Sequence, residues 1–252
     1  MDIIVKNYFL ILARIGTVFV FFPYIGNRMV PNIAKIFLIL SISLLIFLYN
    51  GIKIINFNND ILFFQLLIKE IIIGLILGFV IQLPLTALKI AGDIISFKTM
   101  FSIASVFDPM QEQRNTLWGE FFNVFGFFVL FSTGAYIHMI NGIIYSFKVV
   151  DINYYFEFND IVFKEIISVI SKIMFIGIAI SIPVVIILFV INLCMSIIAK
   201  TMLHFNVFFI GIPLQILIAL IILIFSVEAN ARFIQNIFSY SFRILQKIIN
   251  LI

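Results

Sequence analysis

Seven charged side chains lie within or against strongly apolar stretches of this 252-residue chain, and they are where chemistry would be sought first. They are Arg14, Lys69, Glu70, Lys89, Asp93, Lys98 and Glu228. A charge in hydrocarbon costs several kcal/mol unless it is paired, hydrated or able to reach the surface. Such residues are typical of ion pathways and of structural ion pairs inside a helix bundle.

Glu70 opens a pattern that predicts a helix interface. Glu70, Gly74 and Gly78 are four residues apart and therefore share one side of a helix. Glycines at this spacing expose a face on which a neighbouring helix can approach closely. We expect Glu70 to point into that interface as a paired carboxylate. Arg14 and Lys69 are long enough to snorkel to the membrane surface, and this reading stays open for both.

The search for an enzyme site finds no catalytic arrangement. His138 and His204 lie in different apolar segments, without an acidic residue at metal-ligand spacing. Asp108 and Glu112 are four apart, but Pro109 between them indicates a turn with local charge pairing. No glycine-rich phosphate loop, serine-hydrolase motif or zinc-protease motif occurs. We therefore expect no catalysis, no cofactor and no metal site.

Composition indicates a membrane protein. Hydrophobic residues make up 63% of the chain and charged residues 11%, whereas soluble domains carry about 25% charged residues. The formal net charge is +4, but the basic residues are scattered one per loop, so no nucleic-acid patch is predicted. The single cysteine, Cys194, excludes a disulfide within the chain. The length suits one helical domain over residues 1–252.

Hydropathy predicts an all-α fold with about six long hydrophobic helices. Apolar windows near the roughly twenty residues that cross a bilayer cover Tyr8–Phe22, Ile33–Tyr49, Ile61–Leu83, Phe121–Tyr145, Ile173–Cys194 and Val207–Val227. Basic residues divide almost evenly between the two sides, so charge does not orient the chain. The tail, 228–252, alternates polar and apolar residues at helical spacing, which predicts an amphipathic helix on the membrane or on a partner.

Residues 70–109 contain the most unusual stretch. Beyond Pro84 small and hydroxylated residues alternate with large apolar ones, among them Ser96, Phe97 and Ser102. Such a mixture at membrane depth is tolerated only where the backbone is buried in protein or lines a water-filled cavity. We expect a re-entrant or pore-facing segment, and the alternative is a surface amphipathic helix.

Two blocks of residues together resemble the FliR/SctT family of type III secretion export-gate proteins. The first block is Glu70, Gly74, Gly78, Ala91-Gly92 and Asp108-Pro109, and the second is Asn192-Leu193, Ala199-Lys200, Asn206-Val-Phe208 and Gly211-Ile-Pro213. The similarity spans nearly the whole chain. Two departures stand out: Met100 occupies a position where the family usually has glycine, and Lys200 replaces an arginine, which keeps the charge but loses the planar fork.

The resemblance implies a structural and gating subunit without catalysis, in the bacterial inner membrane. Its partners would be FliP-like and FliQ-like subunits, a FlhB-like subunit, membrane lipid, and unfolded flagellar proteins in transit. The loop at about 91–107 would help close the channel with deformable apolar side chains, namely Phe97, Met100, Phe101, Ile103 and Phe107. The alternative is a small-molecule or ion transporter that uses Glu70, Asp93 and Lys98, although no repeat between halves supports it.

Overall fold

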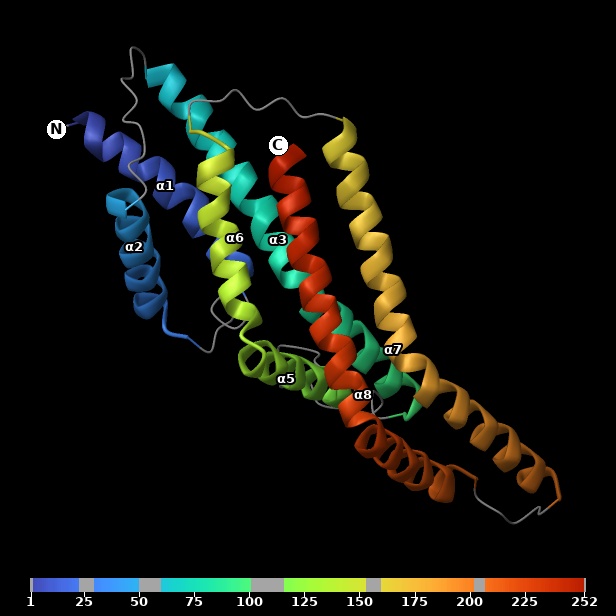
Figure 1. The fold of residues 1–252 in the computed structure, drawn as a ribbon. Helices are drawn as coiled ribbons and strands as arrows, with labels where there is room; N and C mark the ends of the chain where they lie inside the picture. Colours follow the sequence, from blue (N-terminus) through green and yellow to red (C-terminus); the bar gives the residue numbers. More distant parts are fainter. Residues whose placement is uncertain are drawn as a thin grey trace. The chain divides into compact units, whose positions relative to one another are not determined.

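Every regular element of the described chain is an α-helix. The structure, a computed structural model, describes residues 2–22, 30–49, 60–100, 116–152, 160–201 and 207–251. Within these ranges there is no strand (Figure 1). The helices are α1 (Asp2–Phe21), α2 (Asn32–Tyr49), α3 (Asp60–Lys98), α5 (Leu117–Ser132), α6 (Ala135–Val149), α7 (Asp160–Thr201) and α8 (Val207–Leu251).

Most of these helices are long and apolar enough to cross a membrane. In the described ranges four qualify on their own: Ile3–Phe21, Asp60–Lys98, Asp160–Thr201 and Phe209–Leu251. The pair α5 and α6 adds a fifth if it is one broken span, and α2 contains a shorter apolar helix, Asn32–Leu48. The predicted all-α membrane fold is confirmed, and the predicted count of about six helices is approximate.

The window predicted as one helix over Phe121–Tyr145 is interrupted. Helix α5 ends where the Thr133 backbone N–H donates to the Val129 carbonyl, and Gly134 then adopts a left-handed conformation with φ +68°. Only glycine takes this conformation without steric cost, so a single residue ends one helix and starts the next.

Helix α3 continues past Pro84, the residue after which we expected a re-entrant or pore-facing segment. Pro84 lies inside it, although proline removes one intrahelical hydrogen bond. The helix ends only at Lys98, so the first part of the segment predicted as a loop at about 91–107 is helical. The remainder of that loop, from Phe101, lies outside the described residues.

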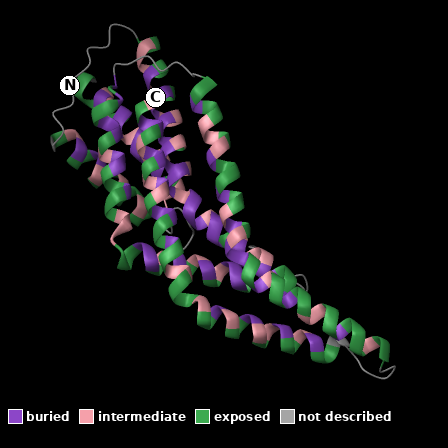
Figure 2. Cartoon of the chain, turned by 45° about the vertical axis from the view of Figure 1, so that its right-hand side comes forward, coloured by how far each residue is buried: buried purple, intermediate pink, exposed green. Residues whose placement is uncertain are grey.

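The chain divides into two compact units that share helices. Unit 1 comprises residues 1–83, 134–169 and 238–252, and unit 2 comprises residues 84–133 and 170–237. Helices α3, α7 and α8 each contribute one part to each unit. The units are therefore not two successive domains along the sequence. In both, helices carry buried and exposed residues, as Figure 2 shows.

In unit 1, the glycine face of α3 packs directly against α1. A Cβ atom added to Gly74 would fall on the Thr17 hydroxyl and lie 2.5 Å from the Arg14 carbonyl oxygen. A Cβ added to Gly78 would lie 2.9 Å from the Val18 carbonyl oxygen. Because neither glycine has a side chain, the backbone of α3 contacts the backbone of α1 directly. On its other side α1 packs against α2.

The predicted amphipathic tail is the C-terminal part of α8, continuous with the apolar part of that helix. From Phe238 onward its buried side chains pack inside unit 1, where we had expected the membrane surface or a partner. Leu245 packs against Gly142 of α6, and the Lys247 Nζ lies 2.8 Å from the Glu165 carboxylate of α7. The apolar stripe of the tail therefore has an intramolecular role.

The glycine contact between α1 and α3 predicts a specific sensitivity. We expect Gly74→Ala to lower the free energy of unfolding by about 1–3 kcal/mol, because the added methyl group overpacks the interface. The measurement is unfolding of the full chain by SDS titration in mixed micelles, followed by circular dichroism. Gly16→Ala is the matched control, since its Cβ would meet nothing closer than Ile39 at 4.0 Å. Equal effects of the two substitutions would contradict the packing argument.

Candidate functional site

Arg14 and Glu70 form a buried ion pair in unit 1. The Arg14 Nε and Nη2 atoms donate to the two Glu70 carboxylate oxygens at 2.5 and 2.9 Å. Both side chains are fully buried, with 0% exposure. From the sequence, Arg14 could also have snorkelled to the membrane surface, but its complete burial excludes this. The glycines that follow Glu70 on the same face of α3 bring α1 close enough for a two-pronged contact.

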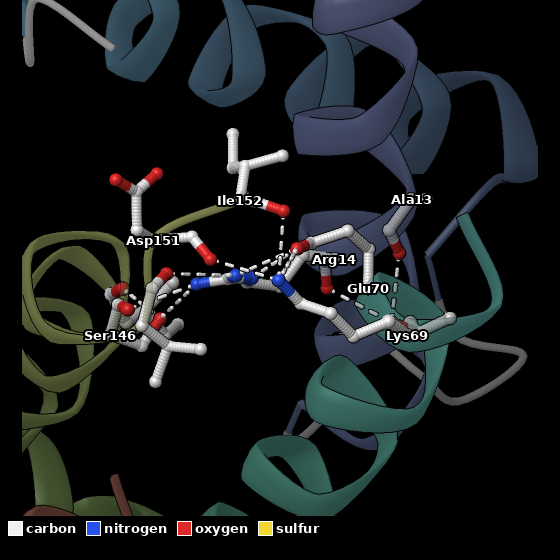
Figure 3. A network of polar contacts seen from close by, with 10 residues as sticks. Ala13, Arg14, Lys69, Glu70, Ser146, Asp151 and Ile152 are labelled. Atoms are coloured by element: carbon white, nitrogen blue, oxygen red, sulfur yellow. Dashed lines mark hydrogen bonds and ion pairs between the residues drawn. The ribbon is translucent and has the colours of Figure 1, made fainter. Parts of the chain in front are cut away.

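The pair is completed by the end of α6, as Figure 3 shows. The Arg14 Nη1 atom donates to the Ser146 carbonyl oxygen at 3.0 Å, and Nη2 donates to the Val150 carbonyl oxygen at 3.3 Å. The guanidinium carbon lies 4.3 Å from the centre of the Phe147 ring. The Ser146 carbonyl also accepts the Val150 backbone N–H at 3.0 Å, and carbonyls at a helix C-terminus carry partial negative charge that attracts a cation. One arginine therefore joins α1, α3 and α6.

Lys69 adds a second cation to the same cluster. Its Nζ atom donates to the carbonyl oxygens of Asp151 and Ile152 at 2.8 and 2.9 Å, and lies 3.4 Å from Glu70. The residue is only 6% exposed, so it does not snorkel either. Arg14 and Lys69 share one carboxylate, so the cluster carries one positive charge more than negative. The backbone carbonyls at and after the α6 C-terminus accept hydrogen bonds from both cations and stabilise this charge. This arrangement fixes structure rather than leaving a carboxylate free for proton transfer.

A second polar cluster, in unit 2, joins the end of α3 to the start of α5. Asp93 and Ser96 on α3 and Thr99 in the turn that follows are spaced three residues apart, and each binds a residue at the start of α5. Thr116 donates to Asp93 Oδ1 at 2.5 Å. The Trp118 backbone N–H donates to Ser96 Oγ, and its indole Nε1 donates to Thr99 Oγ1, both at 3.2 Å. We call these five residues the α3–α5 clasp.

Thr116 and Gly92 allow the end of α3 and the start of α5 to lie close together in the clasp. Thr116 is the N-cap of α5, because its hydroxyl also accepts from the Gly119 backbone N–H at 3.1 Å. A Cβ added to Gly92 would collide with the Trp118 carbonyl and would lie 2.5 Å from the Gly119 Cα. The glycine of the Ala91-Gly92 pair thus permits backbone contact, and Ala91 itself is fully buried.

The clasp brings together the two ends of a segment that contains most of the predicted gate. Residues 101–115 lie outside the described residues, and with them Phe101, Ile103, Phe107, Asp108 and Pro109. Phe97 lies in the last turn of α3 and is 73% exposed. Met100 follows the helix with φ +58°, in the left-handed region that favours glycine.

The second family block spans the connection from α7 to α8. Lys200 is exposed in the last turn of α7, and Asn206 lies outside the described residues. Gly211 is buried in α8, and Pro213 lies inside that helix and is exposed. No described contact brings these residues into either polar cluster.

Sequence reasoning missed several residues on which the two clusters depend. Ser146, Thr116 and Trp118 were not singled out, although Trp118 is the only tryptophan in the chain. No group of three or more His, Cys, Asp or Glu residues that could hold a metal occurs in the described part of the chain. What the two clusters can do chemically is hold helices in fixed register.

Comparison with known proteins identifies relatives over nearly the full length. A family model described as bacterial export proteins, family 1, matches residues 5–241. The chain is 31% identical over 247 residues to the flagellar biosynthetic protein FliR of Bacillus subtilis (strain 168), covering 97% of this chain and 95% of the relative. FliR of Aquifex aeolicus (strain VF5) is 27% identical over 242 residues, covering 95% and 91%. Yop proteins translocation protein T of Yersinia pestis is 25% identical over 225 residues, covering 86% and 84%.

The buried ion pair predicts strong coupling between two distant residues. We expect Glu70→Leu to lower the free energy of unfolding by about 3–5 kcal/mol, because it leaves the buried Arg14 guanidinium without its carboxylate. Arg14→Met should cost less, since Lys69 still lies 3.4 Å from Glu70. The double variant should lose clearly less than the sum of the two, and SDS titration in mixed micelles measures the difference. The exposed Lys6–Asp60 pair, 2.7 Å apart and also between α1 and α3, is the matched control and should show much smaller coupling. Additive losses at Arg14 and Glu70 would refute the structural role.

The left-handed conformation of Met100 predicts a stabilising substitution. We expect Met100→Gly to raise the free energy of unfolding by about 1 kcal/mol, since an L-residue with a side chain pays that cost at positive φ. Lys98→Gly, two residues earlier and still helical, should instead lower it by about 1 kcal/mol. The same unfolding titration distinguishes the two. A loss of stability in both variants would mean that Met100 gains more from its side chain than it loses in its backbone.

Proposed function

This chain belongs to family 1 of the bacterial export proteins, and we propose that it is a structural and gating subunit of the flagellar type III protein export gate. Family membership and long apolar helices make it a multi-pass protein of the bacterial inner membrane and a subunit of the flagellar or type III export apparatus. Its relatives are named for export and flagellar assembly and not as enzymes. The proposal adds a pore, formed with FliP-like and FliQ-like subunits, through which unfolded flagellar proteins cross the membrane. A FlhB-like subunit would join the same assembly.

The α3–α5 clasp is the observation that carries the gating part of the proposal. Thr99 and Thr116 stand at the two ends of residues 100–115, and both belong to the same hydrogen-bonded cluster. The segment therefore leaves and re-enters the helical scaffold at one place. A gate requires a segment that can change conformation while the helices that carry it stay in place. The hydrogen bonds between the end of α3 and the start of α5 would hold these helices in place.

The side chains of this segment suit a gate for unfolded chains. A closed gate must exclude water and ions, and narrow hydrophobic constrictions do so. An open gate must let many sequences slide past, which favours apolar, adaptable side chains over specific polar contacts. We assign this role to Phe97, Met100, Phe101, Ile103 and Phe107.

A small-molecule or ion transporter would use the charged residues differently. Such a protein needs a carboxylate that can bind and release a proton or cation at the site of transport. Glu70 is fully buried between Arg14 and Lys69, and Asp93 accepts a hydrogen bond from the N-cap Thr116. Because both carboxylates already hold helices together, the structure favours the export gate over the transporter.

The gate assignment predicts an ion leak. We expect the combined Phe101→Ser, Ile103→Ser and Phe107→Ser variant to assemble normally but to raise the ion conductance of membranes that carry the export assembly several-fold, because a wetted constriction no longer excludes ions. Planar bilayer recording of the purified assembly provides the measurement.

Leucine at the same three positions is the matched control, since it keeps apolar volume and should keep the gate closed. Conductance at the wild-type level in the serine variant would contradict the gate assignment. Co-purification of FliP-like and FliQ-like subunits with the wild-type chain tests the partners separately, and a chain that purifies alone under mild extraction would contradict that part.

A further inference from the structure

Unit 1 contains an apolar cavity that neither polar cluster uses. Its volume is about 290 Å³, and it lies between α3, α6 and α8. Most of its walls are apolar side chains, among them Val80, Ile81, Met139, Phe238 and Leu245. Binding cavities for whole drug-sized ligands typically measure about 300–1,000 Å³. This one therefore has room for part of a single flexible chain.

Four polar or cationic side chains also line the cavity: His138, Ser239, Ser241 and Arg243. Arg243 is exposed, and its guanidinium carbon lies 6.0 Å from the centre of the Tyr240 ring. His138 is exposed as well, with its ring centre 5.2 Å from that of Phe242. An apolar interior with a guanidinium and an imidazole in its wall matches the two ends of an amphiphile.

Arg243 differs from the neighbouring cations on α8, because among the described residues no carboxylate pairs with it. Arg232 lies 2.6 Å from Glu228, and Lys247 lies 2.8 Å from Glu165. Within the described part of the chain, no carboxylate lies within 4.0 Å of the Arg243 guanidinium. A guanidinium presents a planar fork of donors that suits a phosphate.

We propose that this cavity binds an anionic phospholipid, with part of one acyl chain inside and the phosphate at Arg243 beside His138. Lipid is the solvent of a membrane protein, so an acyl chain is available at high concentration. The positive charge of Arg243 selects a headgroup with net negative charge over a zwitterionic one. The apolar walls provide the binding energy, and Arg243 provides the discrimination. This site is independent of the proposed gate.

Lipid retention by the full chain tests the proposal. The purified chain in neutral detergent is titrated with phosphatidylglycerol or with phosphatidylcholine of the same acyl chains, and native mass spectrometry counts the lipids that stay bound. We expect wild-type protein to retain one phosphatidylglycerol in preference to phosphatidylcholine. Arg243→Gln should weaken phosphatidylglycerol binding about fivefold, the effect of one basic residue at an anionic surface.

Three further variants make the result specific. Arg232→Gln removes the same charge from the same helix away from the cavity and should leave binding unchanged. Arg243→Lys keeps the charge and should retain most of the preference. Ala135→Phe places a ring in the cavity and should abolish retention of both lipids. If that variant does not fold, the comparison of Arg243→Gln with Arg232→Gln decides.

Two results would overturn the site. Equal phosphatidylglycerol binding by wild type and Arg243→Gln would remove the role of the guanidinium. Equal weakening in Arg243→Gln and Arg232→Gln would reduce the preference to general electrostatic attraction. Failure of either kind leaves the ion leak and the gate assignment untouched, because the cavity and the α3–α5 clasp lie in different units.

Discussion

The buried contact between Arg14 and Glu70 is the constraint on which unit 1 depends. Taking two charges out of water is expensive, and it is repaid only when geometry is good and the remaining donors are satisfied. Here the carboxylate accepts two hydrogen bonds from one guanidinium, and the remaining donors reach carbonyls at and after the end of α6. An apolar chain has few ways to define which helices belong together, since lipid and apolar side chains attract one another without preference. A single polar junction between α1, α3 and α6 supplies that definition.

Glycine and polar side chains act together in both units. In unit 1, the absence of side chains at Gly74 and Gly78 lets α1 approach α3, and the approach brings Arg14 within reach of Glu70. In unit 2, Gly92 permits contact with Trp118 and Gly119, and Asp93 and Ser96 then bind the first turn of α5. In each case a small residue sets the distance and an adjacent polar residue sets the register.

The sequence predicts the close-packing face of α3 better than it predicts the polar partners of that face. Helical spacing was enough to place Glu70, Gly74 and Gly78 on one face and to expect a close neighbour there. It was not enough to identify Arg14 as the partner, because an arginine in an apolar helix can also avoid the cost of burial by snorkelling to the membrane surface. The contribution of Ser146 does not show in the sequence, since the shorter of its two contacts with Arg14 is made by the backbone carbonyl, at 3.0 Å, and the hydroxyl accepts at 3.4 Å. The helical continuation to Lys98 was missed because hydroxyls that suggested a water-filled path are satisfied by α5 instead.

The hydrogen bonds between the end of α3 and the start of α5 have a consequence for evolution and engineering. Residues on both sides of 101–115 are hydrogen-bonded to each other, Asp93 to Thr116 and Thr99 to Trp118, and these bonds hold α5 in register with α3. Substitutions at Asp93, Ser96 or Thr116 would therefore act on the placement of α5 against α3 without changing any residue of 101–115.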